Sequence, residues 1–594
     1  MIRVLRSLLF FTVYTVLYIM YNGYSFGIFT HSFTIPFINQ INDPGMYGGD
    51  LMMTMSGKLY SLFFPAMAFI SRYADLRFVS FALYFLSMFV TFTGIFKITG
   101  RIYNRRAAFL TLLLLFSGMR LYIGGSPLFT DLLVQLNFVI PLFVWGLYFL
   151  LRAVDRWPSP LSTVMEDSKR KSARRADYFR SAFILGIAWN FHPMETAYIV
   201  FFILIFYIFE RKNIELRELI LPSAVFLVLA APLLLTLIGD AGEHMDPQWE
   251  EILRTAQWWH IFPFSFPLKT FLAFLIAVAM VVFVPKVNSE RRYHGMIIAL
   301  FTGMMILFFV GTLFTEVLPV STVIKLQLFR SCKIPLLFAF ILFAGYAAED
   351  IGERRNVFLY MLAVLFMMMN FYFQFFAVLL ILFIQRKLAR DISITAPIIF
   401  FAGSLFSLKA PNPLDVGLKL SLLIITAYST WMLVRVKKTK YLVTVSLLSL
   451  LLIISLGTRF AALLKKDIRT TSLNEAQKWL KEHTRPDEYI LADPSFDSIR
   501  VFSQRSAYVT WWDGSLGIFS KEYAKEWWHR MTLLGIYGQN DLPKFADKIN
   551  NDMLSRVYAE FKFRYIVVKK DVSLALEEVF SNREIKIYRY EFEF

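Results

Sequence analysis

Long apolar segments recur through the first three quarters of this chain and then give way to a polar, mixed pattern. Stretches that approach or exceed the roughly 20 residues needed to cross a bilayer follow one another as far as residue 456. A spanning backbone must satisfy its hydrogen bonds internally, so long apolar runs without strand alternation predict helices. We expect a polytopic α-helical membrane protein with more than ten transmembrane helices.

The periodicity changes abruptly after residue 457. Residues 473–482 have the spacing of an amphipathic helix. Three short segments have the character of strands, at residues 489–492, 565–568 and 585–590. We therefore expect a transmembrane domain over residues 1–457 and a small soluble α/β domain over residues 458–594.

Basic residues cluster in particular connections between the apolar segments. The clusters are Arg101/Arg105/Arg106, residues 169–180, Arg211/Lys212, Lys286/Arg291/Arg292, Arg354/Arg355, Arg386/Lys387/Arg390 and residues 435–440. By the positive-inside rule these connections are cytoplasmic. The net charge of +18 thus has a topological explanation, and nucleic acid is not needed as a partner.

This charge map predicts a cytoplasmic N-terminus and an extracytoplasmic C-terminal domain. Two large external loops follow, at about residues 22–76 and 239–267, and part of the first lies along the membrane surface. Proline disfavours helix continuation, so His192-Pro193 should break an apolar stretch into two helices.

Processing signals are few. Residues 1–21 are basic and then apolar but lack a small-residue cleavage site, so they are expected to form the first transmembrane helix. The single cysteine, Cys332, excludes an internal disulfide framework. No Asn-x-Ser/Thr sequon is present, which favours the plasma membrane of a bacterium or archaeon.

The polar segment after the first apolar span contains two carboxylates and three glycines. It reads Asn42-Asp43-Pro44-Gly45-Met46-Tyr47-Gly48-Gly49-Asp50. Proline and glycine disfavour a regular helix and allow close backbone approach to a ligand. A carboxylate placed at hydrogen-bond distance from an attacking hydroxyl can accept its proton. The alternative is a membrane-surface turn in which Asp43 and Asp50 are caps or solvated charges.

The layout of the whole chain resembles the GT-C class of membrane glycosyltransferases, which includes oligosaccharyltransferases, protein mannosyltransferases and aminoarabinose transferases. The resemblance rests on the acidic first external loop, the many aromatic-rich spans and the terminal soluble domain. Shorter motifs are similar to those of prokaryotic relatives in the class: Asp43-Pro44-x-x-Tyr47-x-x-Asp50, His192-Pro193, His260-x-x-Pro263 and Lys325-x-Gln327-x-x-Arg330. It implies a sugar donor linked to a polyprenyl phosphate, and catalysis by Asp50 first or Asp43 second.

One departure limits what the resemblance implies. The oligosaccharyltransferase has a Trp-Trp-Asp-Tyr-Gly peptide-binding motif, whereas this chain reads Trp511-Trp512-Asp513-Gly514-Ser515. The tyrosine is missing, so protein N-glycosylation is not inferred.

A departing lipid phosphate needs positive charge or hydrogen-bond donors around it. The candidates are His192, His260, Lys325, Gln327 and Arg330. A guanidinium is a good bidentate partner for phosphate. The structural alternatives are a helix-kink histidine bonded to a carbonyl, with Glu195 as a possible partner, and cations that snorkel to lipid headgroups.

Acceptor-side candidates are Trp258, Trp259, Arg505 and Asp513. An interfacial aromatic belt and surface ion pairs are the alternatives for these residues. The loop at 239–267 also holds potential metal ligands, namely Asp240, Glu243, His244 and Asp246. Oxygen ligands suit Mg²⁺ or Mn²⁺, but the spacing matches no defined motif, so the metal is left open.

The resulting hypothesis is a multi-pass cell-membrane glycosyltransferase that works at the external face. It moves a sugar from a polyprenyl-phosphate-linked donor to a nucleophile of a glycan, lipid or protein acceptor, with inversion if the acceptor displaces the phosphate directly. A transporter or flippase of lipid-linked or small-molecule substrates, or a noncatalytic membrane scaffold, remains the alternative. A transporter should show ionisable residues within its spans or paired interrupted helices.

Overall fold

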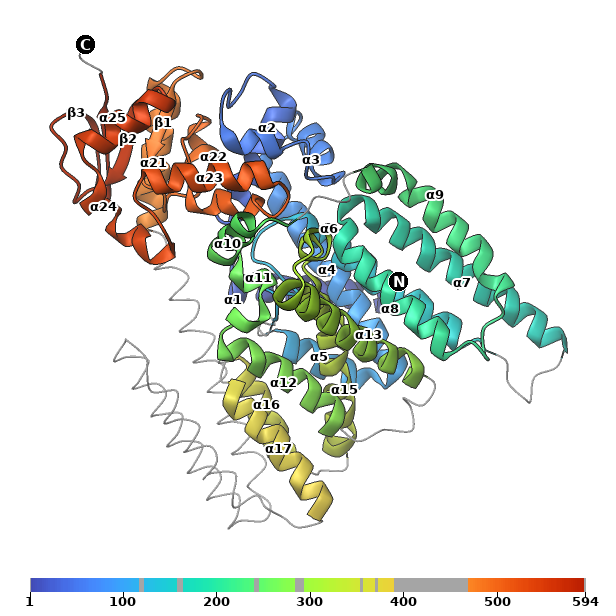
Figure 1. Cartoon of the computed structure of the whole chain (residues 1–594). Coiled ribbons are helices and arrows are strands. Elements are labelled where there is room, and N and C mark those ends of the chain that lie inside the picture. The colour runs from blue at the N-terminus through green and yellow to red at the C-terminus, as the bar shows by residue number, and fades with distance from the viewer. Residues whose placement is uncertain are drawn as a thin grey trace, which may run out of the picture.

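The structure is a computed structural model that describes residues 2–116, 122–125, 127–157, 164–239, 245–283, 293–352, 356–368, 372–388 and 468–591. Its described elements are all helices up to residue 388, and a small α/β domain follows from residue 468 (Figure 1).

The helical part contains α1 (Ile2–Asn22), α2 (His31–Asn42), η1 (Leu51–Met55), α3 (Phe63–Ser71), α4 (Leu76–Ile102), α5 (Arg105–Leu115), α6 (Gln135–Val154), α7 (Val164–Phe191), α8 (Pro193–Phe209), α9 (Arg217–Gly239), α10 (Pro247–Ala256), α11 (Trp258–Ile261), η2 (Pro263–Ser265), α12 (Leu268–Phe283), α13 (His294–Thr312), η4 (Leu313–Val317), α14 (Ser321–Lys325), η5 (Leu328–Cys332), α15 (Lys333–Gly352), α16 (Val357–Met368) and α17 (Tyr372–Leu388). The C-terminal α/β domain, for which we keep the name soluble domain from the sequence prediction, contains α21 (Ile468–His483), β1 (Tyr489–Ala492), α22 (Ile499–Ser503), η6 (Trp511–Leu516), α23 (Lys521–Leu533), η7 (Gln539–Lys544), α24 (Phe545–Lys548), α25 (Asn551–Glu560), β2 (Phe563–Lys569), β3 (Glu577–Ser581) and β4 (Ile585–Arg589).

Among the described residues, six helices are long and apolar enough to cross a membrane. They run Val4–Asn22, Leu76–Ile102, Gln135–Val154, Arg217–Leu235, His294–Val317 and Leu328–Ile351, and shorter apolar helices lie at Pro193–Phe209, Thr270–Met280 and Phe375–Ile384. The polytopic helical class is thus confirmed. The prediction of more than ten spans depends also on residues 389–467, which lie outside the described residues, as does the domain boundary at 457.

Proline interrupts the helical part where the sequence predicts it. α7 ends at Phe191 and α8 begins at Pro193, so the break at His192-Pro193 is confirmed. Pro193 occupies the first helical position, where its missing N–H costs no hydrogen bond.

The basic segment at residues 169–180 is helical, because α7 begins at Val164 and continues through it. Acidic partners neutralise it: Asp177 accepts from Arg156 and Arg180. Arg174 bonds Glu218 of the neighbouring α9 at 2.7 Å. These ion pairs allow a charged helix to pack against α6 and α9.

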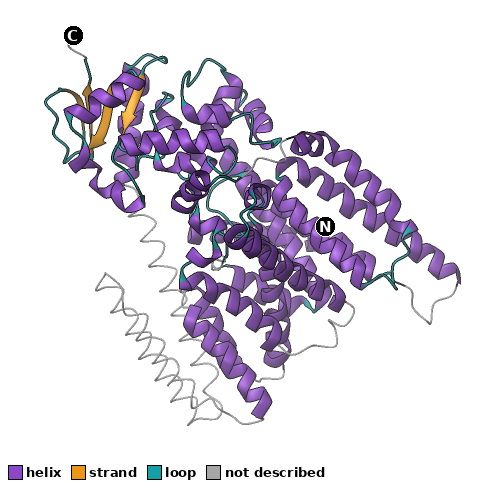
Figure 2. Ribbon diagram, in the orientation of Figure 1, coloured by secondary structure: helices purple, strands orange, loops and turns teal. Residues whose placement is uncertain are grey.

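The soluble domain contains one four-stranded sheet in the order β1-β2-β4-β3. β1 and β2 are parallel, and the other pairs are antiparallel. Figure 2 shows these strands, in orange, gathered at the C-terminal end of the molecule. The three predicted strands are confirmed as β1, β2 and β4, and the predicted helix lies within α21, whereas β3 was not predicted.

The soluble domain packs against the helical part through α10. Asp246 caps this helix by accepting from the Trp249 N–H at 2.7 Å. The same carboxylate pairs with Lys521 and Lys525 of α23 at 2.8 and 2.9 Å. The buried Trp249 indole donates to the Gly517 carbonyl at 2.9 Å. A second contact, at residues 47–50, is described below, so the two loops predicted to be external lie on the side of the soluble domain.

Candidate functional site

Charged and imidazole side chains from separate segments meet inside the helical part. We call this set, His192, Glu195, His260, Arg330 and Lys333, the cationic cluster. Lys333 at the start of α15 pairs with Glu195 in the first turn of α8, and their side chains are only 4% and 5% exposed. Arg330 and His192 both act electrostatically on Glu195. The helix break at His192-Pro193 and the η5–α15 junction therefore form one site.

The loop before α6 connects His260 to Arg330. His260 Nδ1 lies 2.7 Å from the Gly124 carbonyl oxygen. Gly124 and Gly125 both have positive φ, +69° and +68°. A Cβ on Gly125 would lie 2.4 Å from His260 Nδ1, and one on Gly124 would lie 3.0 Å from the Arg330 backbone nitrogen. Only glycine combines this backbone conformation with such close approach.

The state of His260 follows from these contacts. Burial and the charge of Arg330 lower the pKa of His260 from 6.5 to about 3, so the ring is neutral near pH 7. A carbonyl oxygen only accepts, so Nδ1 carries the proton in this arrangement and Nε2 keeps its lone pair. His260 can therefore accept a hydrogen bond from a ligand hydroxyl at Nε2.

Arg330 has unused hydrogen-bonding capacity. Its Nε is buried and has no hydrogen-bond partner among the described residues, and the same holds for the hydroxyl of the neighbouring Ser331. The turn that presents them is strained, since Gln327 has φ +46° and ψ +51°. Tyr198 holds this turn by donating to the carbonyls of Leu326 and Gln327. A strained backbone held in this way is typical of binding sites.

The charges of the cluster favour an anion. Arg330 and Lys333 supply two cations against the single carboxylate of Glu195, while His260 is neutral. The excess positive charge and the free Nε–H suit a phosphate oxygen. Lys325 lies elsewhere, 5.7 Å over the Trp249 ring, and Gln327 contributes through its backbone turn.

The aromatic candidates flank the cluster. Trp258 and Trp259 form a T-shaped pair with centroids 5.4 Å apart. Trp259 also lies 5.6 Å from the His260 ring and close to Gly125. The structure thus places one of the two tryptophans beside the histidine, and the acceptor role of both stays a prediction.

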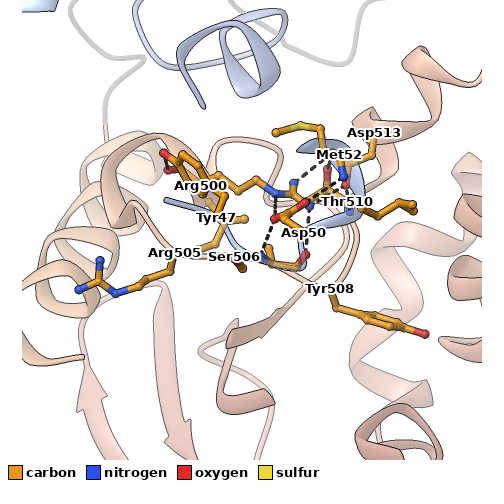
Figure 3. A network of polar contacts seen from close by, with 12 residues as sticks. Tyr47, Asp50, Met52, Arg500, Arg505, Ser506, Tyr508, Thr510 and Asp513 are labelled. Carbon is orange, nitrogen blue, oxygen red and sulfur yellow. Dashed lines mark hydrogen bonds and ion pairs between the residues drawn. The ribbon is translucent and has the colours of Figure 1, made fainter. Parts of the chain in front are cut away.

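The acidic loop forms a second polar network, with the soluble domain. Figure 3 shows the Arg500 guanidinium between the carboxylates of Asp50 and Asp513. Arg500 Nε donates to Asp50 at 2.6 Å, and Nη1 and Nη2 donate to Asp513 at 3.1 and 3.0 Å. Burial raises the pKa of Asp513, against the opposite effect of Arg500 and of the bonds from Thr510.

Asp43 and Arg505, the other two polar candidates of the acidic loop and the soluble domain, do not bond to Asp50, Arg500 or Asp513. Asp43 is exposed, and its Oδ1 accepts from the Gly45 N–H at 3.1 Å. Arg505 points away from the network in Figure 3 and donates to the carbonyls of Lys481 and Thr484 at 2.9 and 2.6 Å. Arg505 therefore ties the end of α21 to the rest of the soluble domain.

No group of three or more His, Cys, Asp or Glu side chains in the described residues is arranged to hold a metal ion. Three of the predicted ligands, Asp240, Glu243 and His244, lie outside the described residues. Asp246 is engaged by two lysines instead.

Glu195 and Lys333 complete a site that the predicted set only outlined. Their signal in the sequence is an acid and a lysine within apolar segments, where ionisable groups are rare and commonly functional. Gly124 and Gly125 gave no chemical signal, because their role comes from contacts with residues far along the chain.

A family model described as a domain of unknown function (DUF6798) matches residues 471–534. The chain is similar to ArnT from Cupriavidus metallidurans in the apo state, with a TM-score of 0.45 and 12% identity over 98% of this chain and 97% of that one. For ArnT bound to undecaprenyl phosphate, the TM-score is 0.40 and the identity 12%, over 94% and 96%. No curated protein matches. At these scores the likeness adds nothing about chemistry, which has to come from the site residues.

Proposed function

We propose that the protein is a GT-C-like membrane glycosyltransferase that moves a sugar from a polyprenyl-phosphate-linked donor to a glycan, lipid or protein acceptor. The observation that supports this most is the cationic cluster, in which the Nε–H of Arg330 is buried without a partner. Buried charge between apolar helices is costly, so it is retained where a ligand uses it. The sequence resemblance to GT-C enzymes names the ligand class.

Each residue of the cluster has a role in this proposal. Arg330 binds the donor phosphate, whose charge grows as the bond to the sugar breaks, and so stabilises the transition state. His260 accepts from a donor hydroxyl at Nε2. Lys333, held by Glu195, adds positive charge without contacting solvent.

A carboxylate of the acidic loop accepts the proton of the acceptor. Of the two, only Asp43 has an exposed side chain, which makes it the available base. Direct displacement by the activated acceptor would invert the anomeric carbon. The acceptor would meet the donor where the acidic loop and the soluble domain join.

The test uses purified protein and a panel of radiolabelled polyprenyl-phosphate sugars. Arg330→Ala should lower transfer about a hundredfold, the usual size of one lost transition-state donor, and Arg330→Lys should recover part of it. Lys171→Ala, which removes an equal charge from an exposed pair with Glu215, is the matched control. EDTA and added Mg²⁺ or Mn²⁺ test metal dependence in the same assay.

Two outcomes would contradict the proposal. Transfer by Arg330→Ala at the rate of the control would remove the cluster from the reaction. Movement of intact donor across vesicles without cleavage of the sugar–phosphate bond would support a transporter instead.

A further inference from the structure

Asp50 is the best-placed acid of the loop by sequence, and both of its carboxylate oxygens accept hydrogen bonds inside the protein. Oδ1 accepts from the Met52 N–H at 3.0 Å, which caps η1. Oδ2 accepts from Arg500 Nε at 2.6 Å and from the Ala507 N–H at 2.9 Å. The side chain is 0% exposed. A general base needs a lone pair directed at its substrate, and complete burial among these three donors keeps both Asp50 oxygens away from any substrate.

Arg500 is equally enclosed. All of its side chain is buried, and its planar fork matches two partners at once. Nε serves the acidic loop through Asp50, while both Nη groups serve Asp513 in η6, and Nη2 also donates to the Ala507 carbonyl at 3.2 Å. Removal of Arg500 would leave two buried carboxylates facing each other, which is strongly unfavourable.

Further contacts extend this connection along the acidic loop. Tyr47 donates from its hydroxyl to the Arg500 carbonyl at 3.1 Å, and the Ser506 hydroxyl donates to the Gly48 carbonyl at 3.1 Å. Tyr47 is buried and has a positive φ of 62°, an uncommon conformation for an aromatic residue. The loop conformation is therefore held from outside, by a domain more than 400 residues further along the sequence.

We propose that Arg500 is a positioning residue, which locks residues 43–50 to the soluble domain through Asp50, and that this lock rather than the Asp50 carboxylate is what the reaction requires. The proposal rests on the proposed function, since it assigns Asp43 as the base that the lock positions. The soluble domain then acts as the support of the active-site loop. Displacement of a catalytic group by about 1 Å can lower the rate about a hundredfold. We expect a loss of this size when the lock opens.

The first test measures the lock without any substrate. Amide hydrogen exchange of residues 47–53 in the full-length protein should become at least about tenfold faster in Arg500→Ala and Asp50→Ala. Arg500→Lys keeps the positive charge but not the planar guanidinium, so its exchange rate should lie between those of the wild type and Arg500→Ala. Arg556→Ala is the control, because its pair with Asp552 is exposed in the same domain. Unchanged exchange in Arg500→Ala would overturn the proposal.

The second test replaces the ionic lock by a covalent one. Gly48→Cys and Ser506→Cys place one thiol on each partner of the loop contact. Gly48 is exposed, and a side chain there would meet only the Gly45 carbonyl at 3.9 Å. Ser506 is buried, as is the native Cys332, so a thiol reagent reaches residue 506 where the lock opens. A short bis-thiosulfonate bridge between the two introduced cysteines should restore turnover to Asp50→Ala and Arg500→Ala, and a reductant should abolish it. The rescue should appear in kcat, with the KM for the donor unchanged within about twofold.

The outcomes separate the lock from the function. If bridged Asp50→Ala regains slow exchange but stays inactive while bridged wild type is active, Asp50 is the base and the proposal is wrong. If no variant or wild type transfers any sugar of the panel, yet Arg500→Ala exchanges fast, the proposed reaction fails and the lock itself stands. Restored turnover in the bridged variants can come only from positioning, because neither contains the Asp50–Arg500 pair.

Discussion

The buried pair of Glu195 and Lys333 gives the sharpest quantitative expectation. Glu195→Gln leaves Lys333 buried beside Arg330 without its counter-ion. Breaking a buried pair by removing one partner typically costs about 3–5 kcal/mol. Lys333→Met should cost less, since Arg330 can then act on the free Glu195 carboxylate.

The double variant Glu195→Gln/Lys333→Met distinguishes a pair from two separate contributions. It removes both buried charges and keeps the side-chain volumes, so it should be more stable than either single variant. Reversible unfolding in mixed micelles with increasing SDS, followed by fluorescence of the 12 tryptophans, measures all four proteins. The coupling between the two sites follows from the double-mutant cycle.

Two results would refute this reasoning. Single variants that each cost less than about 1 kcal/mol would mean that water reaches the pair, as at a protein surface. A double variant that costs the sum of the singles would show that the two charges do not interact. Either result would also weaken the cationic cluster as an enclosed anion site.

Three further predictions concern single positions. Burial and the nearby Asp513 raise the pKa of Asp497 from 3.8 to about 7. A raised folded-state pKa means that this contribution to stability is full below about pH 4 and is lost as pH rises to about 7, so amide protection factors of the soluble domain, which are corrected for the intrinsic pH dependence of exchange, should fall between about pH 4 and 7, and Asp497→Asn should flatten this slope. Gly125→Ala should cost about 1–3 kcal/mol and weaken donor binding, measured by micelle unfolding and isothermal titration, because its Cβ would clash with His260. Asp246→Asn should change thermal stability by less than about 1 kcal/mol for each lost pair, since those lysine contacts are partly exposed.

The local sequence pattern was sufficient to predict elements whose conformation is determined by their own residues. β1 is a short apolar run in which three of four residues are buried, and the start of α8 is set by the fixed φ of Pro193. β3 could not be predicted in this way, because it begins with Glu577 and Glu578 and none of its residues is fully buried. Its strand pairing is supplied by β4, which a window of sequence does not contain.

The site depended more on distant partners. The composition of the acidic loop pointed to a special turn, yet the environment of Asp50 comes from Arg500, 450 positions away. Likewise, Lys333 meets Glu195 across 138 positions and His260 meets Gly124 across 136. Residue type predicted which groups are functional candidates, while tertiary packing decides which of them are enclosed and which stay available.

Two neighbouring glycines of the acidic loop give a matched test of its attachment to the soluble domain. Gly49 has φ +74°, and a Cβ there would lie 2.7 Å from the Tyr489 hydroxyl of β1. Gly49→Ala should therefore cost at least about 1–2 kcal/mol and speed amide exchange of residues 47–53. Gly48 has no positive φ and would meet only the Gly45 carbonyl at 3.9 Å, so Gly48→Ala should leave exchange unchanged. Equal effects of the two substitutions would mean that neither the positive φ of Gly49 nor its contact with Tyr489 restrains the loop.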